Sequence, residues 1–364
     1  MKKNLIVFMP SIEKGGVEKN LFIVSNYLSK KYNGISVISI SKKFKRKFCK
    51  SIDFITLSSN FWDNCGRRFK FLLSIFLLIK EILKNRNIVV FSFQANIYTI
   101  FVCKLFSIKN IIRCNSSPTG WSKNFFKMIL YKYYLKKADK VMVNSLEFKK
   151  ELKKKFNLVS SCIYNPLNIK EIKQKSKLKS KIYFKNRKVL KILNIGRCTE
   201  QKDQLTFLKA LKHIEQTISF EAIILGEGPL RKNLEEFILL NGLKKKVSFK
   251  NFQENPYPII KESDLFILSS KYEGLPNVLL ESIVLKKFII SSSCPTGPKE
   301  ILLNGKGGLL FEVANPKHLS KKILYYFNNK KKCSSFVNKS FLELKRFDYK
   351  TNLEKYFKLV NKFM

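Results

Sequence analysis

The chain has 364 residues, of which 45% are apolar, and this length is enough for two domains with a core each. Its formal net charge of +45 is carried mostly by lysine, a bias typical of an AT-rich genome, although a basic surface also attracts phosphates and anionic lipid. Because no zinc-finger, RNP-like or arginine-rich motif accompanies the charge, we expect no nucleic-acid partner.

The first half of the chain alternates short apolar runs with longer amphipathic segments, beginning at Leu5–Met9. Short apolar runs predict buried strands, and the longer segments between them predict helices. The expected strands are Leu5–Met9, Ile35–Ile40, Ile88–Phe93, Asn110–Arg113 and Lys140–Val143, and the expected helices are Val17–Lys30, Phe69–Lys84 and Phe125–Lys137.

Residues 168–188 are rich in Lys and Ser and weakly patterned, which predicts a linker. The same alternation then restarts and continues almost to the end of the chain. A last helical segment, residues 347–364, is expected to pack back across both domains. The expected strands of the second half are Leu190–Ile195, Ala222–Leu225, Val247–Phe249, Leu265–Leu268 and Phe288–Ser291.

Strand–helix alternation predicts the α/β class, with parallel sheets covered by helices on both faces. Two such runs in tandem predict two Rossmann-like, doubly wound domains, residues 1–167 and residues 189–346. Ligands of such sheets bind outside the carboxyl ends of the strands. We therefore expect a site in a cleft between two facing sheets.

Cysteine and histidine usage limits the metal chemistry of the chain. The eight Cys are scattered singly, and the two His are His213 and His318, so we expect neither a zinc site nor a disulfide framework. The first apolar run is too short for a signal peptide, and no apolar stretch is long enough to span a bilayer. We expect the chain to stay in the cytosol.

Two carboxylates, Glu273 and Glu281, flank a Gly-Leu-Pro-Asn turn that is expected to open a helix at Pro276. At ~1.5 Å per residue along a helix they would lie roughly 12 Å apart, which is too far for the acid pair of a glycoside hydrolase. Free N–H groups at a helix start bind anions. The two acids are therefore expected to hold different parts of one long ligand whose middle is anionic.

Further loops with chemical potential follow other predicted strands. Arg197 and Lys202 come after Gly196 at the end of one strand, where an anion would bind, although the pair by itself is better explained by a solvated loop. Gly226 and Gly228 follow the next strand without the third glycine of a dinucleotide fingerprint, so a plain turn is the alternative. The pair Gly15-Gly16 opens the first predicted helix and fits either a phosphate contact or a tight turn.

Two segments of the first domain are candidates for membrane contact. The run Phe71–Ile79 is almost wholly apolar and has Arg67, Arg68 and Lys70 before it, and the helix Phe125–Lys137 mixes aromatic residues with lysines. Basic helices with a large apolar face bind the lipid interface. The alternative is that both are core helices fringed by lysine.

Taken in order, these motifs resemble the family 4 retaining glycosyltransferases, the glycosyl transferases group 1, which have the GT-B fold. The resemblance covers nearly the whole chain and is carried by several weak motifs in the family's order and spacing. They are Gly15-Gly16, Gly196-Arg197 with Lys202, Gly226-Glu227-Gly228-Pro229, Glu273 to Glu281, and Gly297 through Glu300-Ile301 with Gly308-Leu309.

The resemblance implies a nucleotide-sugar donor bound mainly by the second domain. Arg197 and Lys202 would neutralise the diphosphate, Glu273 would contact the donor sugar, and Glu281 would hold the ribose hydroxyls. The first domain would bind the acceptor and close the site with Gly15 and Gly16. The remaining donor-binding positions implied are Gly196, Gly226, Gly228, Gly274, Leu275, Pro276 and Asn277.

One position departs from the family pattern. The family often has a His in the first-domain loop where this chain reads Arg113-Cys114-Asn115-Ser116-Ser117, and the first domain contains no His. Either Asn115 takes over the sugar contact, or the acceptor contacts differ. The chain also lacks a D-x-D triplet, which argues against the metal-dependent alternative fold, and we expect no metal and no cofactor.

The function expected from these features is retaining transfer of a hexose or N-acetylhexosamine from a nucleotide sugar, with UDP as the expected nucleotide. The expected acceptor is a glycan or a polyprenyl-linked lipid of cell-surface polysaccharide or glycolipid synthesis. The expected location is peripheral, against anionic lipid on the inner face of the cytoplasmic membrane. The alternatives are a GT-B enzyme with a soluble acceptor or epimerase-like activity, and a non-catalytic polyanion-binding protein.

Overall fold

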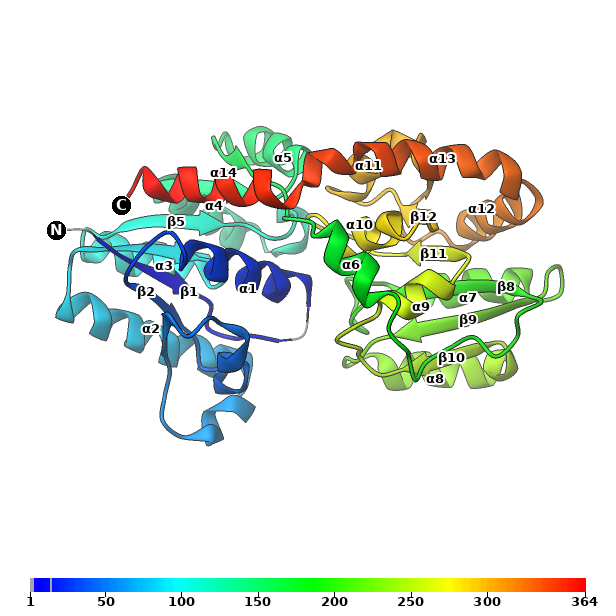
Figure 1. Ribbon diagram of the computed structural model, residues 1–364, viewed down its shortest axis with the longest axis horizontal. Coiled ribbons are helices and arrows are strands. Elements are labelled where there is room, and N and C mark those ends of the chain that lie inside the picture. The colour runs from blue at the N-terminus through cyan, green and yellow to red at the C-terminus, as the bar shows by residue number, and fades with distance from the viewer. Residues whose placement is uncertain (1–2, 14, 123) are drawn as a thin grey trace. The chain divides into compact units, whose positions relative to one another are not determined.

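A computed structural model of the chain describes residues 3–13, 15–122 and 124–364. The chain forms two compact units. The first unit runs to Pro166 and also contains the C-terminal segment Tyr349–Met364, and the second is Leu167–Asp348 (Figure 1). Each unit is a parallel sheet with helices on both faces.

The first unit is built on a seven-stranded sheet whose strands all run parallel, in the order β3-β2-β1-β4-β5-β6-β7. Side chains alternate along β1, so that Leu5 and Val7 enter the core on one face while Ile6 and Phe8 enter the core on the other. The strands are β1 Asn4–Phe8, β2 Ile35–Ile38, β3 Ile52–Ile55, β4 Ile88–Ser92, β5 Lys109–Arg113, β6 Lys140–Val143 and β7 Ser161–Cys162.

Helices α1 (Gly16–Leu28) and α14 (Tyr349–Asn361) share one core with this sheet. The opposite face is covered by α2 (Arg67–Lys84), α3 (Asn96–Leu105), α4 (Phe125–Lys137) and α5 (Leu146–Phe156). These helices run from light blue (α2) through cyan to green (α5) in Figure 1. The short 3-10 helices are η1 Lys42–Lys47, η2 Asn60–Asn64 and η3 Pro118–Gly120.

The second unit is built on a six-stranded parallel sheet of order β10-β9-β8-β11-β12-β13. Strand β8 pairs with β9 on one side and with β11 on the other, so the strand order reverses direction there. The strands are β8 Leu190–Ile195, β9 Phe220–Leu225, β10 Val247–Lys250, β11 Leu265–Leu268, β12 Phe288–Ser292 and β13 Leu309–Phe311.

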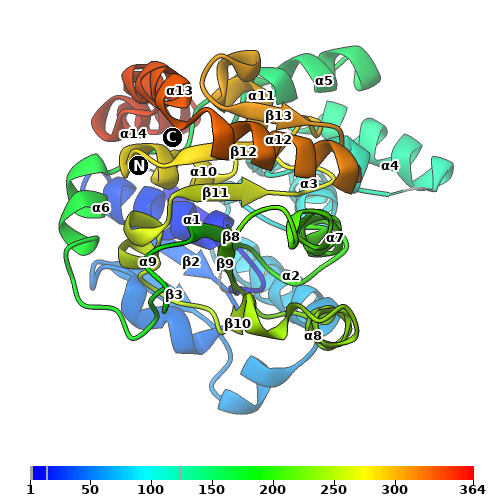
Figure 2. The ribbon, with the colours of Figure 1, turned by 90° about the vertical axis from the view of Figure 1, so that its right-hand side faces the viewer.

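Helices α7, α8 and α12 share the large core on one face of this sheet, and α10 packs against β11 and β12 (Figure 2). The helices are α6 Ile169–Lys175, α7 Gln204–Ile214, α8 Arg231–Leu240, α9 Tyr257–Glu262, α10 Asn277–Val284, α11 Pro298–Ile301, α12 Pro316–Asn328 and α13 Lys330–Leu342. The 3-10 helices are η4 Leu243–Lys245, η5 Leu303–Gly305 and η6 Glu343–Phe347.

The structure differs from the sequence-based expectation at both ends of the second unit. Segment 168–188, expected as a linker, is packed on this unit, because α6 contacts α9 and α10 and Phe184 is buried. The last segment, expected at 347–364, forms α14 and contributes Leu353, Tyr356 and Val360 to the core of the first unit. Strands β3, β7 and β13, each at the edge of a sheet, were not predicted.

Candidate active site

The carboxyl ends of β9, β8, β11 and β12 lie side by side at one edge of the second sheet, because these strands are parallel neighbours. The loops that leave them begin at Gly226, Gly196, Ser269 and Ser293, respectively. In open α/β sheets the edge where the strand order reverses is where ligands bind. All the donor-site residues predicted in the second half lie in these loops or at the start of α10.

Lys202 and Glu273 form an ion pair at this edge, with 2.5 Å between Lys202 Nζ and Glu273 Oε1. Ser270 Oγ donates a second hydrogen bond of 2.6 Å to the same carboxylate oxygen. The Glu273 side chain is 8% exposed and that of Lys202 17% exposed, so solvent screens the pair weakly. The sequence assigned Lys202 to a diphosphate and Glu273 to a sugar, and the structure shows that they also contact one another.

The backbone of the Glu273 loop is fixed by the loop that follows β12. Thr296 Oγ1 donates a 2.6 Å hydrogen bond to the carbonyl oxygen of Glu273. A Cβ atom at Gly297 would lie 2.2 Å from the carbonyl oxygen of Gly274, and Gly297 has a φ of +85°. Only glycine fits this close approach at a positive φ without strain. The buried residues Gly274, Leu275 and Pro276 are thus held in place by the Thr296-Gly297 turn.

Helix α10 begins at Asn277, one residue later than predicted, and Pro276 is its N-cap with φ −70° and ψ 108°. Proline cannot cap the helix through its side chain, and no side-chain cap bond is formed. The start of α10 therefore lacks the side chain that usually satisfies such N–H groups. Glu281 lies about one turn into α10, rather than the two turns expected, and its Oε1 accepts a 3.4 Å hydrogen bond from Tyr257 Oη of α9.

The loops after β8 and β9 are joined through their backbones. Cys198 N donates to Glu227 O at 2.9 Å, and Leu230 N donates to Cys198 O at 3.1 Å. A Cβ atom at Gly226 would lie 2.0 Å from Gly196 O, and one at Gly228 would lie 2.5 Å from Cys198 O. These glycines allow the two loops to pack closely, and the ligand contact predicted for them stays a prediction.

Arg197 is exposed, and its backbone is anchored by Gln204 of α7, whose Nε2 donates to Arg197 O at 3.1 Å. On the other side of the loop, Gln201 Nε2 donates to Tyr272 O at 3.0 Å, and Lys271 N donates to Gln201 O at 2.8 Å. The Arg197–Lys202 segment is therefore pinned to the Glu273 loop. This arrangement brings the three residues predicted as catalytic to one edge of one unit.

Cys198 lies in the same loop and is buried, which raises the pKa of its thiol above the ordinary value. A buried thiol with a raised pKa is a poor nucleophile, because the thiolate is the reactive form. Among the described residues, no cluster of three or more His, Cys, Asp and Glu side chains is placed to hold a metal ion. The charged groups at this edge are therefore suited to binding and electrostatic stabilisation.

Gly15, Gly16 and Asn115, predicted to face the acceptor, belong to the first unit. Gly15 is the N-cap of α1 with φ −175° and ψ −177°, an extended conformation open to any residue. Asn115 follows β5, and its Nδ2 donates to Phe93 O at 2.7 Å while its buried Oδ1 has no hydrogen-bond partner. This unpaired oxygen at the carboxyl end of a strand is consistent with Asn115 in a binding role.

Arg113 was not singled out as a site residue, yet its side chain is only 1% exposed. Its Nε donates to Tyr356 Oη at 3.1 Å, its Nη2 donates to Asn165 Oδ1 at 2.8 Å, and it lies 5.2 Å from the ring centre of Phe93. No signal in the sequence separated this arginine from its neighbours. Ser270, Thr296 and Tyr257 were missed as well. The contacts of Thr296 and Tyr257 join separate segments of the chain, whereas Ser270 lies three residues before Glu273.

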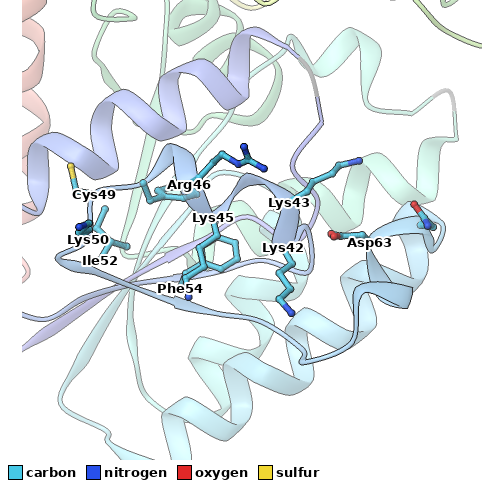
Figure 3. Close-up of a pocket in the computed structure, with 11 residues that line it drawn as sticks. Lys42, Lys43, Lys45, Arg46, Cys49, Lys50, Ile52, Phe54 and Asp63 are labelled. Carbon is cyan, nitrogen blue, oxygen red and sulfur yellow. The ribbon is translucent and has the colours of Figure 1, made fainter.

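A basic hollow of about 930 Å³ lies elsewhere in the first unit, at η1 and β3 (Figure 3). Lys42, Lys43, Lys45, Arg46 and Lys50 line it together with Asp63. None of the predicted site residues lines this hollow. Most of these basic side chains are exposed.

The comparisons with known proteins agree with this geometry. Residues 175–342, nearly all of the second unit, match the family model described as Glycosyl transferases group 1. Over these residues the chain is similar to the group 1 glycosyltransferases. The solved structure described below has the GT-B fold over the whole chain, which confirms the fold class expected from the sequence.

Relatives of this chain include an uncharacterized glycosyltransferase, MJ1059, of Methanocaldococcus jannaschii, which is 34% identical over 56% of this chain and 53% of its own length. The N-acetylgalactosamine-N,N'-diacetylbacillosaminyl-diphospho-undecaprenol 4-alpha-N-acetylgalactosaminyltransferase of Campylobacter jejuni is 26% identical over 95% of this chain and 96% of its own length. The chain thus spans about half of the first relative and nearly all of the second.

A solved structure similar to this chain is Alr3699/HepE of Anabaena in complex with UDP-glucose. The TM-score is 0.78 at 15% identity, and the match covers 99% of this chain and 100% of the other. At this identity the likeness shows the fold. The family match covers most of the second unit, and the fold match covers nearly the whole chain.

Proposed function

We propose that this glycosyltransferase moves a hexose or N-acetylhexosamine from a UDP-sugar, with retention of anomeric configuration. The proposed acceptor is a glycan or a polyprenyl-diphosphate-linked sugar used for cell-surface polysaccharide or glycolipid. The donor is suggested by the Anabaena structure with UDP-glucose, and the acceptor by the undecaprenol-linked substrate in the name of the Campylobacter relative. The observation that carries the proposal is the buried Lys202–Glu273 pair at the switch point of the second sheet.

The leaving group of such a reaction is a nucleoside diphosphate, on which negative charge develops as the bond to the sugar breaks. Fixed cations and N–H groups stabilise that charge without reorganisation of solvent. Lys202 and Arg197 supply the cations from the β8 loop, and the start of α10 supplies the positive end of a helix dipole. Glu273 holds Lys202 in position and accepts hydrogen bonds from hydroxyls of the donor sugar.

Retention needs no protein nucleophile in this scheme. The bond between the anomeric carbon and the diphosphate oxygen breaks, and the acceptor oxygen bonds to the same face of that carbon. The proton of the acceptor hydroxyl passes to the departing phosphate oxygen. The buried Cys198, whose pKa is raised by desolvation, takes no part in these steps.

Glu281 accepts from the ribose hydroxyls of the nucleotide in this proposal. It is 7% exposed, and Tyr257 Oη donates a hydrogen bond to it, so its orientation is set before a ligand binds. A preorganised acceptor discriminates strongly against a ligand that lacks the matching donor. A 2′-deoxyribose analogue of the donor is therefore expected to bind less tightly than UDP-sugar.

A lipid-linked acceptor would require the enzyme to work at a membrane surface. We propose a peripheral location on the inner face of the cytoplasmic membrane, supported by the basic and aromatic helices of the first unit. Within the described part of the chain, no helix is both long enough and apolar enough to cross a bilayer.

The test is a panel of UDP-linked glucose, galactose, N-acetylglucosamine and N-acetylgalactosamine, each assayed for thermal stabilisation of the enzyme and for slow donor hydrolysis. A donor at a hundred times its Kd should stabilise the fold by about 2.7 kcal/mol. Lys202→Met should lower turnover by roughly 10²–10³-fold, because a cation that stabilises the leaving group is lost. Glu273→Gln should lower it similarly, because Lys202 is no longer held in position.

A matched control is available in the same two loops. Lys271 and Glu200 form an exposed ion pair of 3.2 Å between the loops that also carry Glu273 and Lys202. Exposed pairs contribute about 0–1 kcal/mol, so Lys271→Met and Glu200→Gln should retain most of the activity. No response to any UDP-sugar, or equal loss in both pairs of variants, would contradict the proposal.

A further inference from the structure

Helix α2 of the first unit has apolar side chains on two faces. Leu77, Leu78 and Ile82 are buried against the sheet. On the solvent side, Phe69 is 50% exposed, and Leu72, Phe76 and Leu83 are more exposed still. Spacings of three, four and seven residues place these four side chains on one stripe of the helix. An ordinary core helix has a polar outer face, so this outer stripe requires a different explanation.

Helix α3 lies against α2 and continues the pattern. Tyr98, Phe101 and Leu105 are all more than half exposed and follow the same spacing of three and four residues. The rings of Phe71 and Tyr98 are 6.5 Å apart, which joins the α2 surface to that of α3. The two apolar stripes are therefore neighbours across the helix boundary.

Helix α4 completes this surface. The rings of Phe101 and Tyr134 are 6.3 Å apart, so α4 adjoins α3. Phe125 and Phe126 are 72% and 79% exposed, and Ile129, Leu130 and Tyr133 continue the apolar side one and two turns later. Leu135 is the only buried residue of α4, all of whose residues are described, so this helix faces outward for almost its whole length.

More than half of the exposed large apolar side chains among the described residues lie on these three helices. We call the solvent side of α2, α3 and α4 the α2–α4 face. Its elements are labelled one after another in the first unit of Figure 1. An apolar surface this extensive marks an interaction site rather than ordinary solvent exposure.

The charges on these helices identify the kind of partner. All residues of α2, α3 and α4 are described, and Glu81, which is bonded to Lys84 at 2.6 Å, is their only carboxylate. The basic residues include Arg67 and Arg68 at the start of α2 and Lys127, Lys132 and Lys136 along α4. An apolar surface with a basic fringe complements a bilayer that carries anionic headgroups.

We infer that the α2–α4 face is a membrane-docking surface that binds anionic bilayers, with Phe125 and Phe126 entering the headgroup–acyl boundary and the surrounding lysines contacting lipid phosphates. A second copy of the chain would bring two basic faces together and is disfavoured by charge repulsion. No zinc-finger, RNP-like or arginine-rich motif accompanies the charge, which disfavours a nucleic acid. The inference deepens the proposed function and rests on it for the need to reach a lipid-linked acceptor.

The test is flotation of the full chain with phosphatidylcholine vesicles that either contain or lack phosphatidylglycerol, over a series of salt concentrations. The protein should float with the anionic vesicles and be released as salt rises, because its attraction to the headgroups is screened. The double variant Phe125→Ser/Phe126→Ser should bind at least about tenfold more weakly, because the rings no longer enter the interface.

The matched control is Leu239→Ser/Leu240→Ser, which changes two adjacent apolar side chains of α8, 56% and 80% exposed, in the second unit. This variant should float like the unaltered protein. Both double variants should keep the thermal shift given by UDP-sugar, so that loss of docking is separated from failure of the proposed function. Absence of flotation with anionic vesicles, equal loss in both variants, or a dimer in solution that depends on Phe125 and Phe126 would overturn the inference.

Discussion

The carboxylate of Glu273 is matched by one lysine and one hydroxyl, at 2.5 Å from Lys202 Nζ and 2.6 Å from Ser270 Oγ. Burying a carboxylate costs free energy, and only well-placed cations and hydrogen-bond donors offset this cost. Here the partners come from the end of β11 and from the loop after β8. The arrangement gives the site a fixed acceptor and a fixed cation before any ligand arrives.

Gly226 provides a test of the close packing between the site loops. In Gly226→Ala the new Cβ would lie 2.0 Å from Gly196 O, a backbone atom that cannot turn away. We expect the free energy of unfolding to fall by about 1–3 kcal/mol and UDP-sugar binding to weaken, because the Gly196 loop is displaced. Gly66→Ala, where nothing lies within 4 Å, should be nearly neutral in the same urea titration. Equal stability of the two variants would contradict this account.

Asp203, the N-cap residue of α7, is expected to make the stability of the fold depend on pH. Burial raises the pKa of its carboxyl above the ordinary value, against the hydrogen bond from Thr206 Oγ1. Because the pKa is raised in the folded state, the charged carboxylate destabilises the fold at pH values above that pKa. This penalty disappears once the pH falls below the pKa of the carboxyl in the unfolded chain. Asp203→Asn should therefore melt higher than the unaltered chain at neutral pH. The difference should shrink towards pH ~4, near the ordinary pKa of aspartate, and a difference that grows instead would refute the assignment.

Helix α14 illustrates how one element is placed by contacts remote in sequence. It follows the second unit in the chain, yet it shares a core with α1 and β1 of the first unit. Its Tyr356 is fully buried, and Tyr356 Oη accepts the hydrogen bond from Arg113 Nε. The helix therefore completes the environment of a buried guanidinium at the end of β5.

Tyr356→Phe tests this contribution of α14. The change leaves Arg113 buried with one acceptor fewer, and an unsatisfied buried charged group costs about 1–3 kcal/mol or more. We expect a loss of at least that size in the free energy of unfolding measured in urea. The control is Tyr32→Phe, which removes an exposed hydrogen bond to Asn361 of the same helix and should cost less than about 0.5 kcal/mol. A Tyr356 variant as stable as the control would show that Arg113 needs no acceptor here.

At the scale of the whole molecule, 71 basic residues face 26 acidic ones, so the chain repels itself. Excess charge of one sign destabilises a compact state, and salt screens it. We expect the melting temperature to rise with added sodium chloride while binding to anionic vesicles weakens. Differential scanning calorimetry over a salt series checks the first effect, and a melting temperature that falls with salt would contradict it.

The proposed chemistry meets the charge of the diphosphate with Lys202, Arg197 and the start of α10. We therefore expect sugar transfer to continue at an unchanged rate after treatment with EDTA and removal of the chelated ions. The rate is measured with and without added magnesium, using the donor that gives the largest thermal shift. Loss of activity on chelation, restored by magnesium, would show that an ion shares the charge of the leaving group.

Much of this molecule was determined by local sequence. Apolar runs and amphipathic segments predicted most of the central strands and the helices α2 and α4. The spacing of apolar residues that marks such an element lies within a short stretch of sequence. Glycines and charged residues after strands predicted which loops would form the site. The structure brings those of the second unit to one edge of the sheet, because its strands are parallel. The sequence did not predict the short strands β3, β7 and β13 or the packing of residues 168–188, because their apolar patterns are too brief or too polar.

The tertiary structure decided what sequence spacing could not express. Lys202 and Glu273 are 71 residues apart, and their ion pair exists because β8 and β11 are neighbours in the sheet. Arg113 and Tyr356 are 243 residues apart and meet because α14 packs on the first unit. The sequence alone determined where the charged residues and the glycines lie along the chain. The pairing of strands and the packing of helices determined which of them touch. That pairing is set by the apolar surface that all strands and helices of a sheet bury together.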